Sequence, residues 1–525
     1  MDRRDLIARG YFPRELPPPF KTSSLAHFVV SNISLQLTSR TNSKLYIHSH
    51  VRYGSLRRKL SIPNPAFFVQ IAKVIDNNWN DIKLITQKSN FSKSKPVHTP
   101  HPKRNRSISP LLDFPDLPKE RAKNRAIGRY ALQTDISQFY QSIYTHSIPW
   151  AIHGKEIAKS QRNDPSLLGN QLDKLVRNSQ DSQTIGIPIS PDTSLIIAEL
   201  ILCTLDLELE RRISSSCLHP YRGFRYSDDY EFVFLTRSEA ETALSHLQKI
   251  LSAFELTLNP NKTRIVELPC SLDATWVLEL SDYKFSNSKL AQMQDIIRYF
   301  DRAFQISKEF PQEPVLKYAI ARIENFHELH QDNWSLLESL LLQSVTIESS
   351  TLRDALSIFQ NSQIKNYPVD LDSLEKNLNL QVLQHAPLGH SSEVAWAIWS
   401  IIVFKLSIYE EASQAISDME DSIVAILALD AQQRGRIPKG LVTRQWEQFL
   451  TEDELYGNQW LFSYEANRQG YLSTGYDHVS RDPWFSQLKQ GKVTFYDRAT
   501  PLFIPPGETS GPSGEIEAFG INSKR

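Results

Sequence analysis

Three aspartates stand where carboxylates could hold metal ions. Asp135 ends a short apolar segment that begins at Tyr130, and Asp228 and Asp229 are adjacent between two aromatic runs. Neighbouring like charges repel each other, and hard cations such as Mg²⁺, which prefer carboxylate and phosphate oxygens, relieve that repulsion. Two such ions about 4 Å apart activate an attacking hydroxyl and stabilise the leaving oxygen of a phosphoryl transfer. The pattern indicates polymerase or nuclease chemistry with two Mg²⁺ ions, or Mn²⁺ in their place.

An Asp-rich turn is the simpler interpretation of Asp228 and Asp229, because Asp side chains stabilise turns by bonding to nearby backbone. Their surroundings favour the metal site. The runs 221–226 and 230–235 are rich in aromatic and β-branched residues, which predicts a hairpin with the acidic residues at its tip.

The elements that position these residues can be read from periodicity. A helix-like run follows Asp135 up to Tyr144; segments 193–213 and 239–254 have the apolar pattern of helices, and 263–268 that of a strand. This order predicts an α+β fold for residues 131–280. Residues 1–130 mix short apolar runs with Pro-rich breakers, and 281–500 are almost wholly helical in pattern. No fixed repeat length is visible, so a helical-repeat array is one architecture among others, and 501–525 form a tail.

The charge is unevenly distributed along the 525 residues. The whole chain has 59 basic and 59 acidic residues, but residues 1–130 contain 24 Lys or Arg and 8 Asp or Glu, a net charge of +16. The segment 82–112 has no acidic residue at all. It is either a surface for phosphates, which Lys and Arg bind in a salt-sensitive way, or a solvated basic loop without a partner.

Several other classes of protein lack support in the sequence. Three separated cysteines, Cys203, Cys217 and Cys270, predict neither disulfides nor a Cys-based zinc site. His327 and His330 have no evident third zinc ligand. The longest apolar run, 394–404, is too short to span a bilayer, and the first ten residues do not resemble a secretory signal. We therefore expect a cytoplasmic protein without a membrane partner.

Four segments in order resemble the palm motifs of reverse transcriptases. They are QTDISQFYQSIYTH (133–146), GIPISPDTSLIIAE (186–199), YSDD (226–229) and LTLNPNKTRI (256–265). Upstream, SLRRKLSIPNP (55–65) resembles their fingers motif. The resemblance implies a right-hand polymerase with fingers and palm, an RNA-directed DNA polymerase that takes dNTPs and makes single-stranded DNA.

The resemblance also implies roles for individual residues. Asp135, Asp228, Asp229 and the backbone carbonyl of Ile136 match the metal contacts, and Lys262 matches the lysine that protonates the leaving pyrophosphate. Tyr140 matches an aromatic gate against the nucleotide 2′-hydroxyl; the simpler interpretation is that Tyr140 belongs to the apolar face of a helix. The matched nucleotide-binding residues are Arg58, Lys59, Tyr140, Gly186 and Pro188.

Other features resemble one branch of this family. The second motif has Pro188-Ile189-Ser190 where templated enzymes usually have Pro-Gln-Gly. This difference, with SSEVAWAIWS (391–400), WLFSYEANRQGYL (460–472) and DPWFSQLKQGKVTFYD (482–497), resembles bacterial defence-associated reverse transcriptases of the abortive-infection (AbiK-like) group. That resemblance implies a HEAT-like helical domain after the palm, antiphage defence, untemplated protein-primed DNA synthesis and a homo-oligomer, trimer or hexamer.

Three alternatives remain open at this stage. The chain could be a templated reverse transcriptase that uses a bound non-coding RNA, or a splicing-type maturase. It could also be a non-catalytic scaffold that binds RNA or a phage protein. Trp396, Trp399 and Trp460 are expected in the core rather than at a ligand.

Overall fold

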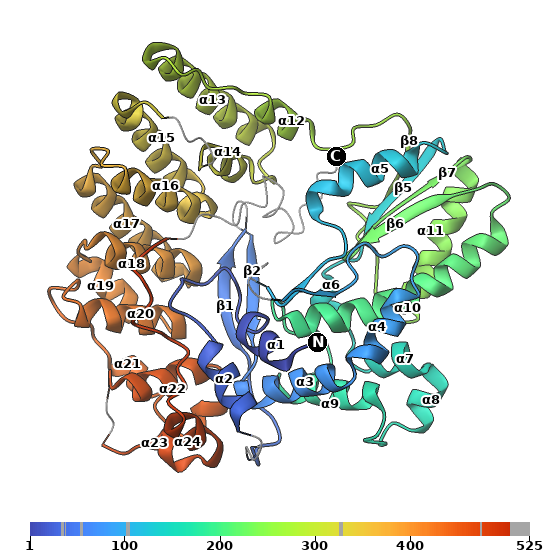
Figure 1. The fold of residues 1–525 in the computed structure, drawn as a ribbon, viewed down its shortest axis with the longest axis horizontal. Coiled ribbons are helices and arrows are strands. Elements are labelled where there is room, and N and C mark those ends of the chain that lie inside the picture. Colours follow the sequence, from blue (N-terminus) through green and yellow to red (C-terminus); the bar gives the residue numbers. More distant parts are fainter. Residues whose placement is uncertain are drawn as a thin grey trace.

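The computed structural model describes residues 1–32, 36, 38–52, 56–100, 106–324, 329–472 and 475–504. These residues form a mostly helical α+β structure. Figure 1 shows a sheet on one side of the molecule, an arc of helices on the other, and a two-stranded hairpin between them.

The sheet on which the aspartates lie has the strand order β6-β7-β5-β8, and all neighbours are antiparallel. Its strands are β5 (Tyr130–Asp135), β6 (Arg222–Tyr226), β7 (Asp229–Phe234) and β8 (Arg264–Glu267). Helix α11 (Arg237–Ser252) packs on β5 and β7, and α10 (Asp192–Ser216) packs on α11. Both helices, the strand at 263–268 and the hairpin were predicted from the sequence and are confirmed.

Local sequence explains where α11 begins. The Thr236 side chain accepts a hydrogen bond from the Glu239 backbone N–H, and Glu239 accepts from the Thr236 N–H in return. This reciprocal capping satisfies backbone donors that the first turn leaves without helical partners. Helix α11 therefore begins directly after β7.

The amino-terminal region surrounds a separate hairpin. Its strands β1 (Tyr46–Val51) and β2 (Arg57–Ile62) are antiparallel, with His50 opposite Arg58. The remaining elements up to β5 are α1 (Arg3–Arg9), α2 (Ser23–Ser31), α3 (Pro65–Asn77), α4 (Trp79–Gln87), β3 (Val97–His98), β4 (Ile108–Ser109) and α5 (Leu117–Arg125).

The helix predicted between Asp135 and Tyr144 is much shorter than expected. Only Phe139–Ser142 form a helix, α6, because Gln138 has a left-handed φ of 44° and Tyr144 forms a β-bridge with Ile185. The next helices are α7 (Ser147–His153), α8 (Lys155–Ser160) and α9 (Leu168–Asn178). Backbone contacts with the loop before α10 are therefore made by Tyr140, Ile143 and Tyr144 of the expected helix.

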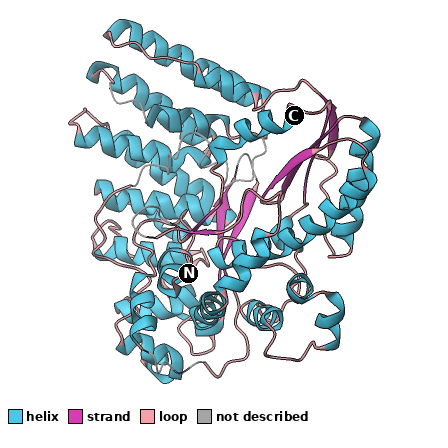
Figure 2. Ribbon diagram, turned by 45° about the vertical axis from the view of Figure 1, so that its right-hand side comes forward, coloured by secondary structure: helices cyan, strands magenta, loops and turns pink. Residues whose placement is uncertain are grey.

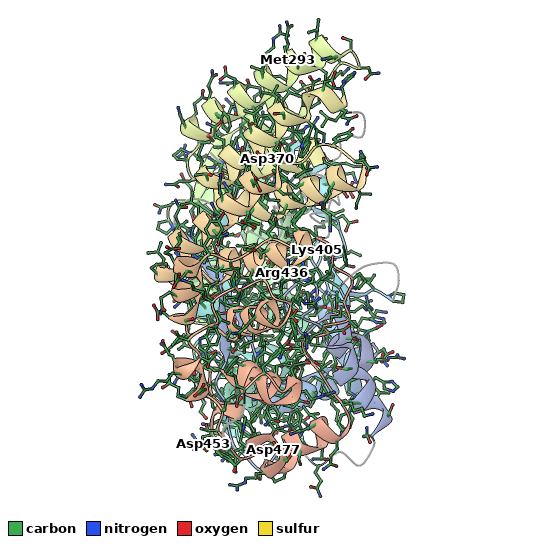
Figure 3. All side chains as sticks on the ribbon, turned by 90° about the vertical axis from the view of Figure 1, so that its left-hand side faces the viewer. Met293, Asp370, Lys405, Arg436, Asp453 and Asp477 are labelled. Atoms are coloured by element: carbon green, nitrogen blue, oxygen red, sulfur yellow. The ribbon has the colours of Figure 1, made fainter. Side chains whose placement is uncertain are left out.

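The described elements after residue 270 are all helical; this was predicted from residue 281 onward, whereas the helix at 275–281 was not predicted. They are α12 (Thr275–Ser281), α13 (Lys289–Glu309), α14 (Val315–Glu324), α15 (Trp334–Ile347), α16 (Leu352–Ile364), α17 (Leu371–His385), α18 (Ser391–Phe404), α19 (Glu410–Ser417), α20 (Ser422–Gln433), α21 (Arg444–Glu447), α22 (Trp460–Gln469), α23 (His478–Arg481) and α24 (Pro483–Gln490). Figure 3 shows this side of the molecule, with Met293 near one end and Asp453 and Asp477 near the other. The tail beyond residue 504 lies outside the described residues.

The helical region packs directly on the amino-terminal region. The Tyr46 hydroxyl on β1 donates to Asp421, and the Trp460 indole donates to the Ile62 carbonyl on β2. Trp396, Trp399 and Trp460 are each at most 4% exposed, which confirms them as core residues. One continuous cluster of buried apolar side chains extends from Leu6 to Ile504, so residues on both sides of positions 130 and 280 share a core.

The basic segment 82–112 is not an extended arm in its described part. Ser92 forms a parallel bridge with Arg225 of β6, and the Lys93 N–H donates to the Arg225 carbonyl over 2.8 Å. Lys93 pairs with Glu120, and Arg106 pairs with Asp192 of α10. Residues 101–105, with Lys103 and Arg104, lie outside the described residues. Carboxylates distant in sequence thus neutralise two of its cations, and phosphate binding by this segment stays a prediction.

The cysteines and the hydropathy of the helices were also considered in the sequence. Cys203, Cys217 and Cys270 are all free thiols. Among the described helices, none has both the length and the hydropathy needed to cross a bilayer.

Candidate active site

The three aspartates meet where two strands of the sheet end. Asp135, the last residue of β5, is directly opposite Asp229, the first residue of β7. Side chains opposite each other in an antiparallel pair share a face, with Cβ atoms about 4.5–5.5 Å apart. Asp228 lies in the turn between β6 and β7, and its carbonyl accepts a hydrogen bond from the Ile136 N–H over 3.2 Å. The fold thus brings Asp135, Ile136, Asp228 and Asp229 together.

The electrostatics of this cluster suit a divalent cation. Burial, and then the charge of Asp135, raise the pKa of Asp228 above its ordinary value. Asp135 is 5% exposed, and its Oδ1 atom has no hydrogen-bond donor within the part of the chain that the structure describes. A buried carboxylate oxygen without a donor is costly. An all-oxygen donor set of this kind fits Mg²⁺ or Mn²⁺.

Lys262 completes the cluster from the turn that leads into β8. Its Nζ donates to Asp135 Oδ2 over 2.6 Å. Burial alone would lower the pKa of Lys262, but the hydrogen bond to Asp135 and the charges of Asp229 and Asp228 outweigh it and raise that pKa. The Asn259 N–H donates to the Asp135 carbonyl over 2.9 Å, which fixes this turn beside β5. Lys262 is therefore held as a charged ammonium among the three carboxylates.

A buried ionic network supports the turn that carries Asp228. The Arg225 guanidinium on β6 is fully buried and contacts Glu199 and Asp206 of α10, each over 2.8 Å. It also donates to the Ser227 carbonyl over 2.8 Å. The Ser227 N–H donates to the Ser94 hydroxyl over 2.7 Å, and Ser94 donates to Glu199 over 2.7 Å. Both backbone groups of Ser227, which has a left-handed φ of 51°, are thus bound to this network.

This network was not predicted from the sequence, although a signal was present. Glu199 and Asp206 are acidic residues within the apolar helix pattern of 193–213, seven positions apart and hence on one face. Two carboxylates on the buried face of a helix require a cationic partner. Ser94 gave no signal of its own.

The residues predicted to contact the nucleotide differ in their relation to the aspartate cluster. Burial, and next the charge of Asp228, raise the pKa of the half-buried Tyr140 well above its ordinary value. Burial and the charge of Arg52 lower the pKa of Arg58, which Glu15, Asp228 and Tyr140 partly offset. The charge of Asp228 thus acts on Arg58 of β2. Lys59 is exposed, and because side chains alternate along a strand it lies on the other face of β2.

Gly186 and Pro188 lie in the loop that leads into α10. Gly186 has a φ of +84°, which favours glycine, and its N–H donates to the Ile143 carbonyl over 2.8 Å. The neighbouring Ile187 N–H donates to the Tyr140 carbonyl over 2.9 Å. Pro188 is buried, and the Ile189 carbonyl accepts from the Ser61 N–H of β2 over 2.9 Å. This loop joins Tyr140 to the strand that carries Arg58.

Similarity to known proteins is found among solved structures. No family model matches the chain, and no curated protein matches it. Among solved structures, telomerase from Candida albicans with a fragment of telomeric RNA aligns over 78% of this chain and 65% of its own, with 11% identity and a TM-score of 0.31.

Telomerase from Candida tropicalis gives similar values. With the RNA fragment it aligns over 77% of this chain and 68% of its own, with 11% identity and a TM-score of 0.32. The chain spans 51% of the Candida tropicalis telomerase truncated from its C-terminal domain, with 10% identity and a TM-score of 0.30. Similarity at this level assigns neither a function nor a substrate.

Proposed function

We propose that this protein is a nucleotidyltransferase of the reverse-transcriptase type, which polymerises deoxynucleoside triphosphates with two Mg²⁺ ions. The observation that carries the proposal is the pairing of Asp135 with Asp229 across β5 and β7, with Asp228 in the adjoining turn and Lys262 bonded to Asp135. Four residues from distant parts of the sequence thus form one cluster of three carboxylates and one ammonium.

Each residue of the cluster has a distinct role in this proposal. Asp135, Asp228 and the Ile136 carbonyl would hold the ions, and Asp229 would support or share them. When bound, the ions neutralise phosphate charge and lower the barrier to attack by a primer hydroxyl. Lys262, whose pKa is raised by its carboxylate neighbours, keeps a proton on Nζ that it can donate to the leaving pyrophosphate.

The surrounding residues would bind the nucleotide. Arg58 suits bidentate contact with a triphosphate and lies near Asp228, whereas the placement of Lys59 makes it the weaker candidate. The ring of Tyr140, on whose pKa the charge of Asp228 acts, would exclude a nucleotide 2′-hydroxyl and so favour DNA synthesis. Gly186 and Pro188 would shape the nucleotide pocket, because their loop bonds to both α6 and β2.

The template requirement, the primer, the biological role and the oligomeric state are proposed from the sequence resemblance alone. Ile189 cannot order a template base as a glutamine amide would, so synthesis is proposed to be untemplated and primed by a protein hydroxyl. The proposal also includes a role in antiphage defence, a HEAT-like arrangement of the helices in residues 281–500, and assembly into a homo-oligomer, either a trimer or a hexamer. Its alternative is RNA-templated synthesis on a bound non-coding RNA.

One experiment tests the chemistry and the template requirement together. The purified protein is incubated with Mg²⁺ and each dNTP separately, with and without added RNA, and the product is then treated with protease. DNA that forms without added template and loses a protein adduct on proteolysis supports untemplated, protein-primed synthesis. RNA that co-purifies is sequenced, because it would be a hidden template. If no product forms with any dNTP, the proposed activity is wrong.

A further inference from the structure

Two histidines and a glutamate converge far from the aspartate cluster, at the junction of α17 and α18. The Nδ1 atoms of His385 and His390 are 2.9 Å apart. Glu393 Oε1 is 3.8 Å from His385 Nδ1 and 3.7 Å from His390 Nδ1. Glu393 is 2% exposed, and both histidines are half-buried.

The local sequence explains the convergence. His385 is the last residue of α17, and the chain reverses through a short 3₁₀ turn that ends at Gly389, whose φ is +64°. His390 is the residue that precedes α18, and Glu393 lies in the first turn of that helix. The three donor atoms meet because the chain reverses between residues only five and three positions apart, so no long-range pairing is needed to bring them together.

The distances match those that a small transition-metal ion requires. The circle through the three donor atoms has a radius of about 2.0 Å, and zinc bonds to histidine nitrogen and carboxylate oxygen are about 2.0–2.2 Å long. An ion can thus contact all three atoms if it displaces the proton of the hydrogen bond between the two Nδ1 atoms. From this geometry we propose that His385, His390 and Glu393 form a binding site for a divalent transition metal of the Zn²⁺ class, with water as the fourth ligand.

The surrounding side chains orient the glutamate. Arg57 of β2 donates to both oxygens of Glu393, with Nη2 2.8 Å from Oε2, and the Ser392 hydroxyl donates to Oε2 over 2.8 Å. A carboxylate has about four lone-pair positions. The Ser349 hydroxyl donates to Oε1, the atom nearest the histidines, over a long 3.4 Å, and a metal ion would replace this hydrogen bond. Outer hydrogen bonds of this kind are usual around metal-binding carboxylates. The Arg57 charge opposes a cation, which favours moderate affinity over very tight binding.

The site has a structural consequence that is independent of the proposed polymerase activity. Glu393 connects α18 to β2 through Arg57, and Arg57 is adjacent to Arg58. The Ser392 hydroxyl also accepts from the Val51 N–H of β1 over 3.1 Å. A bound metal would therefore fix the α17–α18 turn and the hairpin together, and its removal should loosen both.

The test uses the full-length protein, freed of metal with a chelator and titrated with Co²⁺ as a spectroscopic probe. Four-coordinate Co²⁺ with nitrogen and oxygen ligands absorbs visible light strongly, whereas an oxygen-rich six-coordinate site absorbs weakly. The Asp228→Asn variant is titrated in parallel, because the aspartate cluster is itself proposed to bind divalent ions. We expect about one equivalent of strongly absorbing Co²⁺ in both proteins, displaced by Zn²⁺.

His385→Gln and His390→Gln should each weaken this signal at least about 10-fold. His153→Gln should leave it unchanged; His153 is a half-buried histidine on α7 whose ring accepts from the Gly169 N–H. Absence of the signal in the wild-type protein overturns the proposal. This part of the test does not depend on the folding of any variant. Persistence of the signal in both His→Gln variants would equally overturn the proposal.

Discussion

Arg225 Nη1 donates to Glu199 Oε1 over 2.8 Å, and neither side chain is more than 4% exposed. This ion pair joins β6 to α10 directly beneath the turn that contains Asp228. Because Arg225 and Ser94 bind the two backbone groups of Ser227, the position of the candidate metal ligand Asp228 depends on residues outside the cluster of three aspartates.

Ser94→Ala should separate positioning from stability. The variant removes the acceptor of the Ser227 N–H and should cost about 1–2 kcal/mol of unfolding free energy. Ser89→Ala is the matched control, because Ser89 donates to Asp206 in the same network over 2.6 Å without contacting the turn. We expect similar losses of stability in denaturant titrations, but a lower kcat for nucleotide incorporation only in Ser94→Ala. Equal kcat values for the two variants would contradict a positioning role.

Asp228→Asn should abolish synthesis while it stabilises the metal-free protein. Loss of a metal ligand removes several kcal/mol of transition-state stabilisation, so incorporation should fall roughly 100- to 1,000-fold. Burial and Asp135 raise the folded-state pKa of Asp228, so the folded protein binds this proton more tightly than the unfolded chain does. Stability is therefore lost as the pH rises through that raised pKa. Without metal at neutral pH, the Asn variant should melt at a higher temperature than the wild type; a lower melting temperature would argue against a strained acidic cluster.

Arg58→Ala should raise the KM for the nucleoside triphosphate roughly 10-fold or more, because a charge-assisted contact with phosphate is worth about 1.5–3 kcal/mol. Lys59→Ala provides the comparison, since Lys59 is exposed on the other face of β2. Steady-state kinetics should show little change for Lys59→Ala. A larger increase in KM for Lys59→Ala than for Arg58→Ala would show that the triphosphate binds to the other face of β2, and would contradict the role proposed for Arg58.

Tyr140→Ala should reduce discrimination against ribonucleotides. If the ring excludes the 2′-hydroxyl, its removal should raise the efficiency of incorporation of rNTPs relative to dNTPs, roughly 10- to 100-fold. Tyr140→Phe keeps the ring and should preserve the discrimination. Ratios of kcat/KM for one rNTP and its matching dNTP measure the effect, and unchanged selectivity in Tyr140→Ala would make Tyr140 a packing residue.

The buried carboxyl group of Glu465, which lies outside the candidate active site, should make the stability of the protein depend on pH. Burial raises the pKa of this fully buried α22 residue from 4.5 to about 7, despite hydrogen bonds from Phe495, Gln469 and Thr494. Because the folded-state pKa is raised, the stability contribution is present below about pH 4.5 and is lost as the pH rises through 7. The loss should be at most roughly 3 kcal/mol.

Glu465→Gln should remove this dependence between pH 5 and 8 in thermal melts. Glu410→Gln, a change at an exposed residue, should keep it. An identical slope in the wild type and Glu465→Gln would show that another group titrates.

Much of the local structure was predictable from the sequence. Runs of aromatic and β-branched residues on either side of Ser227-Asp228 predicted the hairpin, and the apolar pattern of 193–213 and 239–254 predicted the two helices behind it. Figure 2 shows how these helices and strands lie side by side. Such features follow from contacts between residues close in sequence. The short α6 is the exception, since the bridge between Tyr144 and Ile185 overrides its helical pattern.

The aspartate types and their order were thus determined by the sequence itself, but their meeting was decided by strand register. Nothing in the chain near Asp135 specifies that Asp229 lies opposite it, or that Lys262 bonds to it; both depend on pairings across about 100 residues. The same holds for Arg225 with Glu199, and for Arg57 with Glu393, which crosses from the hairpin to the helical region. Ionic partners distant in sequence are selected by the need to neutralise each buried charge, and only the packed tertiary structure determines which charges are buried together.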